Sequence, residues 1–389
     1  MKQVFVRRAL AALLAAGLVP AVHAELAVSA NDAKVTLDNG KAAYHPDGRD
    51  TVAVIDLAPT HKGKPPVLVA EFAAPASIVG PPQSVAITPD ESLALVTANQ
   101  KIDPANPNRT IPNNQMSVID LKASPPAVIA TVETGLGPAG VSITRKGNMA
   151  LVANREEGTI SVFAIEGKTL TPLGKIELGN PKAGPSGIAI SPDGQMALVT
   201  RDGDHRISVL AIRQGSVDYI KRDMFGGLRP YGIHFAANSE FALFSNLGMA
   251  QGDADTLSLI DTKRVPPRIV DTVSVGQTPE GTALSPDGKY AAVTVTNGSN
   301  KPVNSPFYNA LGVIKLYKVV DQKKLVFASQ IETGVWTQGV VFSSDGKTLL
   351  VQNKEQNEIQ VLRRMGDKLV DTRQRIKLSA GPVAIRTVE

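Results

Sequence analysis

The sequence predicts an all-β fold, a seven-bladed β-propeller of four-stranded antiparallel blades. Three features predict it: a recurring proline, an apolar alternation directly after it, and a tight turn about eight residues beyond it. The copies start 45 to 58 residues apart, at Pro82, Pro138, Pro185, Pro230, Pro279, Thr337 and Pro382. Seven copies at this period indicate that each copy is one sheet of a repeat architecture.

Each of the first six copies contains the patterns of four successive strands. In the third copy, the apolar run of residues 188–190 favours a strand whose two faces, alternating with period two, each pack against a neighbouring layer. The turn Pro192-Asp193-Gly194 then favours a hairpin, because proline presets φ and glycine accepts a positive φ. Residues 197–199 and 207–209 follow as the second and third strands, and a more polar fourth strand closes each unit. Four antiparallel strands arranged radially make a propeller blade.

The last copy is incomplete, and the chain itself offers the missing strands. Residues 381–385 supply an inner strand, after which the sequence ends. Residues 34–37, 51–56 and 67–70 match strands two, three and four of a blade, in that order. We therefore expect the last blade to be closed by one C-terminal and three N-terminal strands, which leaves no open sheet edge.

Residues 1–24 have the pattern of a bacterial secretory signal peptide. Lys2, Arg7 and Arg8 precede an apolar stretch, and small residues at 22–24 predict cleavage after Ala24. Residues 25–389 are then one seven-bladed β-propeller domain, which we expect to be a soluble, periplasmic monomer. The formal charge of +5 falls to +2 without the three basic residues of the signal, which gives nucleic-acid binding little support.

Absent residue types and absent patterns exclude further classes. The chain has no cysteine, which excludes disulfides and covalently attached c-type haem. After the signal, no apolar stretch is long enough to span a bilayer. No Gly-x-Ser-x-Gly motif, phosphate-binding loop or zinc-type histidine spacing is present. We expect no cofactor.

The repeat segments also resemble a known family. Residues 151–154 (Leu-Val-Ala-Asn) followed by 159–162 (Thr-Ile-Ser-Val), together with 117–120, are similar to the YVTN-repeat propellers. Their seven-bladed relatives include the lactonase-like propellers. The resemblance covers nearly the whole mature chain and implies the propeller fold. For activity it implies hydrolases, cyclases, lyases and binding proteins alike.

Two residues are candidate catalytic groups. In a propeller, the loops that enter the inner strands and those that join strands two and three surround one end of the central channel, where function usually lies. Of the residues that start the inner strands, Glu280 carries a charge and is a candidate general base. His234 replaces the small residues found at its position in most other blades. The alternatives are a paired glutamate at the rim and a histidine packed between blades.

Seven residues on or near these loops are candidates for ligand binding: Arg155, Arg201, His205, Arg229, Tyr231, Trp336 and Gln338. Asp202 and Asp204 have metal-ligand chemistry, but Arg206 stands where a calcium loop needs another oxygen. We therefore interpret these aspartates as part of a polar turn with local ion pairs and predict no metal site.

Two functions remain open. The first is a periplasmic binding or scaffold protein for a small ligand or a protein partner, and we favour it because the repeats account for most residues. If the protein has this function, the long connections 99–115, 246–256 and 297–312 should form a platform. Phe307, Tyr308 and Tyr231 should then lie in one exposed patch.

The alternative is a lactonase-like enzyme that hydrolyses or closes a lactone ring. It uses Glu280 or His234 as base and Arg155, Arg201 or Arg229 to stabilise an anion. It requires Glu280, an arginine and one of His234 or His205 to converge at the mouth of the channel.

Overall fold

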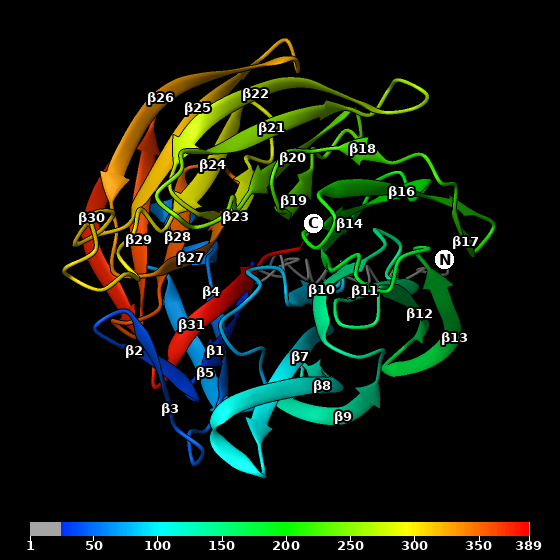
Figure 1. Cartoon of the computed structure of the whole chain (residues 1–389), viewed down its shortest axis with the longest axis horizontal. Helices are drawn as coiled ribbons and strands as arrows, with labels where there is room; N and C mark the ends of the chain where they lie inside the picture. Colours follow the sequence, from blue (N-terminus) through cyan, green and yellow to red (C-terminus); the bar gives the residue numbers. More distant parts are fainter. Residues whose placement is uncertain (1–24, 389) are drawn as a thin grey trace, which may run out of the picture.

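The chain forms a ring of seven radial β-sheets around a central channel (Figure 1). The computed structural model describes residues 25–388, so the predicted signal peptide lies outside the described residues. Each sheet has four antiparallel strands, and the sheet of the third blade has one additional short strand. The predicted fold class is therefore confirmed. Within residues 25–388 no helix has the length and apolar character needed to cross a membrane.

Blades are numbered here by the order of their inner strands along the chain. Blade 1 contains β6 (Val85–Ile87), β7 (Leu93–Asp103), β8 (Asn106–Asp120) and β9 (Ala127–Glu133). Blade 2 contains β10 (Pro138–Ile143), β11 (Met149–Asn154), β12 (Thr159–Glu166) and β13 (Thr169–Glu177). Blade 3 contains β14 (Pro185–Ile190), β15 (Met196–Arg201), β16 (Arg206–Arg213), β17 (Ser216–Tyr219) and the additional β18 (Met224–Phe225).

The second half of the ring repeats this order. Blade 4 contains β19 (Pro230–Phe235), β20 (Phe241–Asn246), β21 (Asp255–Asp261) and β22 (Arg268–Gly276). Blade 5 contains β23 (Pro279–Leu284), β24 (Tyr290–Val295), β25 (Val313–Val320) and β26 (Lys324–Glu332). Blade 6 contains β27 (Thr337–Phe342), β28 (Thr348–Asn353), β29 (Glu358–Met365) and β30 (Lys368–Lys377).

Blade 7 joins the two ends of the chain, as the sequence predicts. Its strand order is β31 (Gly381–Arg386), β1 (Leu26–Asp32), β4 (Thr51–Asp56) and β5 (Val67–Ala73), with the short 3-10 helix η1 (Ala58–Lys62) between β4 and β5. One C-terminal and three N-terminal strands therefore close the ring.

The predicted second strand of blade 7 is wrong in its residues. That strand is β1, all of whose residues are buried, and not residues 34–37. Instead β2 (Val35–Asp38) pairs with β3 (Lys41–Tyr44) in a separate hairpin. Asn39 and Gly40 join them with φ values of 44° and 76°. An Asn-Gly pair with positive φ at both positions makes the tight turn that closes a two-residue hairpin loop, so this segment pairs with itself.

The three long connections lie on one face of the ring but differ in structure. The predicted loop 99–115 is mostly an extension of β7 and β8 into a long hairpin. The other two connections touch each other, because the Lys301 ammonium donates to the Ala250 carbonyl and Phe307 packs over Gly252. The 297–312 connection also meets the β2–β3 hairpin, where the Val303 amide donates to the Asn39 side chain. These segments form a collar on this face.

The hydrophobic core lies between adjacent blades. One cluster, for example, joins Leu95 and Val118 of blade 1 to Val141 and Phe163 of blade 2. Hydroxyl groups of the second strands add hydrogen bonds to the next blade, as from Thr200 Oγ1 to the Tyr231 carbonyl (2.6 Å) and from Ser245 Oγ to the Glu280 carbonyl (3.1 Å). The inner strands are thus held in fixed register around the channel.

Candidate functional site at the entry mouth of the channel

The inner strands begin at one end of the channel, which we call the entry mouth, and end at the other, the far end. The first side chains after the repeat prolines (or Thr337) belong to the entry mouth. They are all buried: Gln83, Ala139, Ser186, Tyr231, Glu280, Gln338 and Val383. The entry mouth thus has polar side chains in some blades and apolar side chains in others, although the backbone is nearly the same in every blade.

Close backbone packing fixes these positions. A glycine follows the entry residue in blades 2 to 6. A Cβ on Gly232 would lie 2.6 Å from the Glu280 carbonyl oxygen, and one on Gly281 would lie 2.7 Å from the Gln338 carbonyl oxygen. Because any side chain at these glycines would force adjacent inner strands apart, glycine is required there. The same close approach brings Tyr231, Glu280 and Gln338 beside one another.

Glu280 is a buried carboxyl group poised to titrate near neutral pH. Only 7% of its surface is exposed, and this burial is the largest cause that raises its pKa from 4.5 to about 7. The Gln338 side chain, the positive charge of Arg229 and the Trp336 side chain act against this rise and lower the pKa. Desolvation exceeds these stabilising interactions, so near pH 7 Glu280 can both take up and release a proton.

Two arginines from adjacent loops meet at one buried aspartate. Asp202 Oδ2 lies 2.5 Å from Arg155 Nη2 and 3.4 Å from Arg229 Nη2, while the second oxygen, Oδ1, has no hydrogen-bond partner among the described residues. The Asp202 side chain is 1% exposed, whereas both arginine side chains remain about one-third exposed. Asp202 thus orients two guanidinium groups that can still reach a ligand at the mouth.

The prediction of a polar turn with ion pairs describes Asp202 and Asp204 correctly. Asp204 Oδ1 accepts a hydrogen bond from Arg201 Nε (2.9 Å), and Asp202 forms the arginine pairs described above. Within residues 25–388 no group of three or more metal-ligating side chains of the His, Cys, Asp or Glu type is present.

Arg229 and Trp336 at the mouth have strained backbones. Gly137 and Gly184, which precede the inner-strand prolines of blades 2 and 3, have positive φ values of 68° and 59°. Arg229 and Trp336 occupy the same position in blades 4 and 6 with φ values of 55° and 54°. A bulky residue in the left-handed region is an outlier that costs on the order of 1 kcal/mol or more. Strain of this kind concentrates at functional sites, and here it occurs at two residues that lower the pKa of Glu280.

Tyr231 adds a neutral donor to the same cluster. It is 6% exposed, and burial is the largest cause that raises the pKa of its hydroxyl, with a further contribution from the Glu280 carboxyl group. The hydroxyl therefore stays protonated at all physiological pH values. The charges of Arg155, Asp202 and Arg229 also act on the pKa of Tyr231, so this hydroxyl is influenced by the arginine pair as well as by Glu280.

Lys354 and Asp32 extend the cluster and were not among the predicted site residues. The Lys354 ammonium lies 4.9 Å from the centre of the Trp336 ring, in cation–π geometry, and 3.3 Å from Asp32 Oδ2. It also donates to the Val35 carbonyl of the β2–β3 hairpin. This hairpin therefore buttresses Trp336 through Lys354. Lys354 could have been found from the sequence, because it lies in a short connection on this face. No sequence pattern points to Asp32.

Six of the nine predicted site residues gather here, namely Arg155, Arg229, Tyr231, Glu280, Trp336 and Gln338. His205 supports them, because its Nδ1 accepts a hydrogen bond from the Arg229 amide (3.2 Å). With φ of 64° it occupies the turn position that Gly158 and Asn357 fill in blades 2 and 6. Arg201 points elsewhere and bonds within blade 3 to Asp204, Ser208, Tyr219 and Asp223.

His234 does not join Glu280. It is the fifth of six residues in β19 and lines a cavity at the far end of the channel. Its Nδ1 accepts a hydrogen bond from the Leu284 amide of the next blade (3.1 Å), just as Ser142 Oγ accepts one from the Ile190 amide (3.1 Å). This geometry matches the structural alternative of a histidine packed between blades.

The exposed aromatic patch expected by the binding hypothesis is not formed. Phe307 is 40% exposed, but Tyr231 is buried in the mouth cluster and cannot share a surface patch with it. Phe307, Tyr308 and Tyr231 therefore do not form the patch that the binding hypothesis requires.

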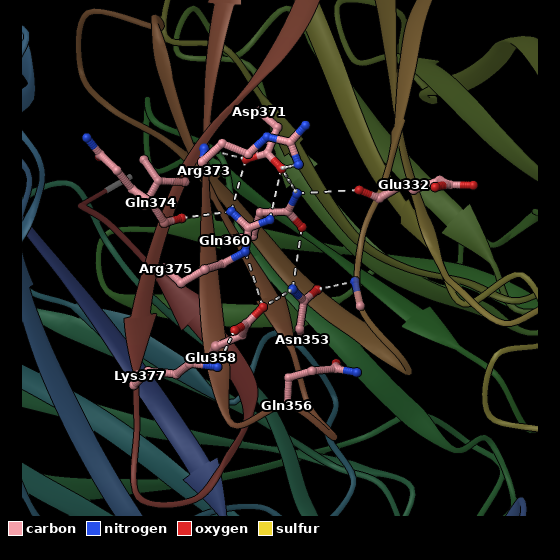
Figure 2. Close-up of polar contacts among 12 residues, drawn as sticks. Glu332, Asn353, Gln356, Glu358, Gln360, Asp371, Arg373, Gln374, Arg375 and Lys377 are labelled. Carbon is pink, nitrogen blue, oxygen red and sulfur yellow. Dashed lines mark hydrogen bonds and ion pairs between the residues drawn. The ribbon is translucent and has the colours of Figure 1, made fainter.

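A second charged cluster provides a contrast, at the outer rim between blades 5 and 6 (Figure 2). Arg375 bridges Asp371 (2.9 Å) and Glu358 (3.3 Å), and Lys377 pairs with Glu358 (2.6 Å). Gln360 donates to Asp371 and to the Glu332 carbonyl (both 3.4 Å). Acids and bases pair across β29 and β30, so this network stabilises the blade.

Comparisons with known proteins agree with this architecture. The family model described as "Lactonase, 7-bladed beta-propeller" matches residues 113–224. None of the curated proteins matches the chain. The chain thus has the seven-bladed architecture of the lactonase-like propellers.

Three solved structures illustrate the likeness. A putative 6-phosphogluconolactonase of Bacteroides uniformis has a TM-score of 0.70 at 20% identity, covering 94% of this chain and 100% of that one. A putative 6-phosphogluconolactonase of Bacteroides fragilis has a TM-score of 0.69 at 19% identity, with 95% and 99% covered. The periplasmic gluconolactonase of Pseudomonas aeruginosa has a TM-score of 0.67 at 16% identity, with 94% and 99% covered. At such identities the likeness concerns the fold.

Proposed function

We propose that this protein is a lactonase that hydrolyses a lactone ring at the entry mouth, with Glu280 as the general base. The observation that carries the proposal is a buried carboxyl group with a pKa of about 7 beside the Arg229 guanidinium. A general base works best when its pKa lies near the operating pH. The names of the similar structures and of the matching family model point to the same class of reaction.

The proposed reaction assigns each group one task. Deprotonated Glu280 takes a proton from water as the water oxygen attacks the lactone carbonyl carbon. The negative charge on the carbonyl oxygen is stabilised by Arg229 and Arg155, which Asp202 holds in place. Tyr231, which stays protonated, donates a hydrogen bond. The ring C–O bond then breaks, the ring oxygen takes the proton from Glu280, and a hydroxy acid leaves, with one water consumed.

We further propose that the mature protein acts in the periplasm after cleavage behind Ala24. The basic start and apolar stretch of residues 1–22 support export. One of the structurally similar proteins is itself named a periplasmic gluconolactonase.

The test is a proton-release assay of purified residues 25–389 against a panel of sugar and aliphatic lactones. We expect hydrolysis of at least one lactone, and a loss of about 10²- to 10⁴-fold in kcat for Glu280→Gln, which keeps the shape of the side chain. Arg373→Gln, a substitution at the exposed outer rim, is the matched control and should keep full activity. A folded protein that is inactive on the whole panel, or a fully active Glu280→Gln variant, would exclude the mechanism.

A further inference from the structure

The far end of the channel contains a second cavity that the proposed reaction does not use. Its volume is about 220 Å³, and it lies where the inner strands end, at the opposite end of the channel from Glu280. Its wall is mostly apolar and includes Ile190, Phe235, Leu284 and Phe342. An apolar cavity of about 150 Å³ accommodates benzene, so this one has room for a ring with a substituent.

Two arginines line this cavity, the buried Arg386 and the exposed Arg145. Arg386 lines the cavity from blade 7 and is 5% exposed, and Arg145 lines it from the turn after β10. The hydrogen bond found for Arg145 runs from Nη1 to the Ala237 carbonyl (3.3 Å), and Arg145 forms no ion pair with a carboxylate of residues 25–388. Its guanidinium can therefore still bind an anion, and a planar bidentate contact to a carboxylate is the strongest form of such a bond.

The two carboxylates that residues 25–388 contribute to the wall are already engaged. Glu25 Oε2 lies 2.7 Å from His61 Nε2, and Glu25 Oε1 accepts a hydrogen bond from the Ser344 amide (2.6 Å). Glu91 accepts a hydrogen bond from the Leu26 amide (2.7 Å), and burial raises its pKa. Both acids thus connect the N-terminal strand to neighbouring turns, and neither neutralises Arg145.

We propose that the far-end cavity is a binding site for a small apolar carboxylic acid, whose ring or branched chain fills the cavity and whose carboxylate pairs with Arg145. The residues that line the cavity indicate the chemistry of this ligand. Apolar side chains from several blades surround the body of the ligand, and the Arg145 guanidinium binds its carboxylate. This site is independent of the proposed lactonase reaction.

Benzoate is the probe, titrated into the purified mature protein by isothermal calorimetry. We expect saturable binding with a Kd of about 1 mM or tighter, and weaker binding of benzyl alcohol, which has the same ring without the charge. Arg145→Gln should weaken benzoate binding at least about tenfold, because it removes a charge-assisted hydrogen bond. Lys146→Gln, the adjacent exposed cation outside the cavity wall, is the matched control and should change the affinity less than about twofold.

Two further variants separate this site from the entry mouth. Ala237→Trp, at an exposed position of the cavity wall, should block benzoate while the protein remains folded by circular dichroism. Glu280→Gln should bind benzoate as the wild type does. The proposal is overturned if benzoate does not bind, if benzyl alcohol binds equally well, if Arg145→Gln retains the wild-type affinity, or if Glu280→Gln alone loses it.

Discussion

The two ends of the channel are made by the same seven inner strands, yet they have opposite character. At the entry mouth the first strand residues bring Glu280, Tyr231 and Gln338 together below two arginines. At the far end the last strand residues, such as Ile190 and Leu284, leave an apolar cavity. The backbone of the inner strands is nearly the same from blade to blade at both ends. The different character of the two ends therefore comes from the side chains at the start and at the end of each inner strand. A rigid repeat can therefore hold two unlike sites about one axis.

The largest expected effect concerns the charge at the entry mouth. Arg229→Gln should lower kcat/KM for the lactone about 10²- to 10³-fold, because it removes a preorganised positive charge next to Glu280. His234→Ser at the far end should leave kcat/KM unchanged. Steady-state kinetics on both purified variants measure the contrast. Equal losses in both would show that the two ends are coupled and would break the comparison.

The second effect is a pH dependence of stability that comes from the entry mouth. The pKa of Glu280 is 4.5 when unfolded and about 7 when folded, so this group stabilises the fold fully below pH 4.5 and loses that contribution as the pH rises through 7. Between pH 5 and pH 8 the wild type should therefore lose unfolding free energy that Glu280→Gln does not lose. The difference in unfolding free energy between the two proteins should shift in favour of the variant by about 2 to 3 kcal/mol.

Urea unfolding at the two pH values measures this difference. Asp255, whose pKa burial raises to about 7, titrates over the same range in both proteins and therefore cancels in the comparison. Parallel pH profiles for wild type and variant would refute the assigned pKa of Glu280.

The third effect tests the far end. His234→Phe leaves the Leu284 amide without its acceptor and should cost about 1 to 3 kcal/mol of unfolding free energy. His234→Ser should cost less, because Ser142 accepts the equivalent hydrogen bond between blades 2 and 3. Thermal and urea unfolding distinguish the two variants. If both cost the same, the hydrogen bond does not account for the histidine.

The smallest effect concerns backbone strain at the entry mouth. Thr278 has φ of 55° where blades 2 and 3 have Gly137 and Gly184. Thr278→Gly should stabilise the fold by up to about 1 kcal/mol. The reciprocal Gly184→Thr should destabilise it, since a Cβ there would lie 2.7 Å from Asp202 Oδ1. A destabilised Thr278→Gly would show that the mouth is not strained at this position.

Much of the architecture could be predicted, because each blade repeats the same local signals. The repeat prolines and turns located the inner strands, and the incomplete last copy predicted the closed ring. The error at residues 34–37 arose from the Asn39-Gly40 turn, a local hairpin signal that competes with the blade pattern. The long connection expected at 99–115 is a hairpin for a related reason: its strands continue pairing beyond the ring.

The candidate site could be predicted in part. The location of Glu280, Tyr231 and Gln338 could be predicted, because each comes directly after the repeat proline or Thr337. That position lies at the entry mouth in every blade. The strand position of His234 likewise implies the far end, because His234 lies three residues of extended chain beyond Tyr231 at the mouth. Two contacts could not be predicted from the sequence. One is the pairing of Asp202 with two arginines, and the other is the pair of Asp32 and Lys354. Both join residues that are distant in sequence, so no local pattern indicates them.

The sequence by itself determined the number of blades, the closure of the ring and which residues begin the inner strands at the entry mouth, because strand period, turn chemistry and repeat length are local properties. Only the tertiary structure decided which of these residues touch. The pKa of Glu280 depends on burial between blades and on Arg229, Gln338 and Trp336, which come from other repeats. Electrostatic energy depends on distance in space and on the exclusion of water, and packing of the whole ring sets both.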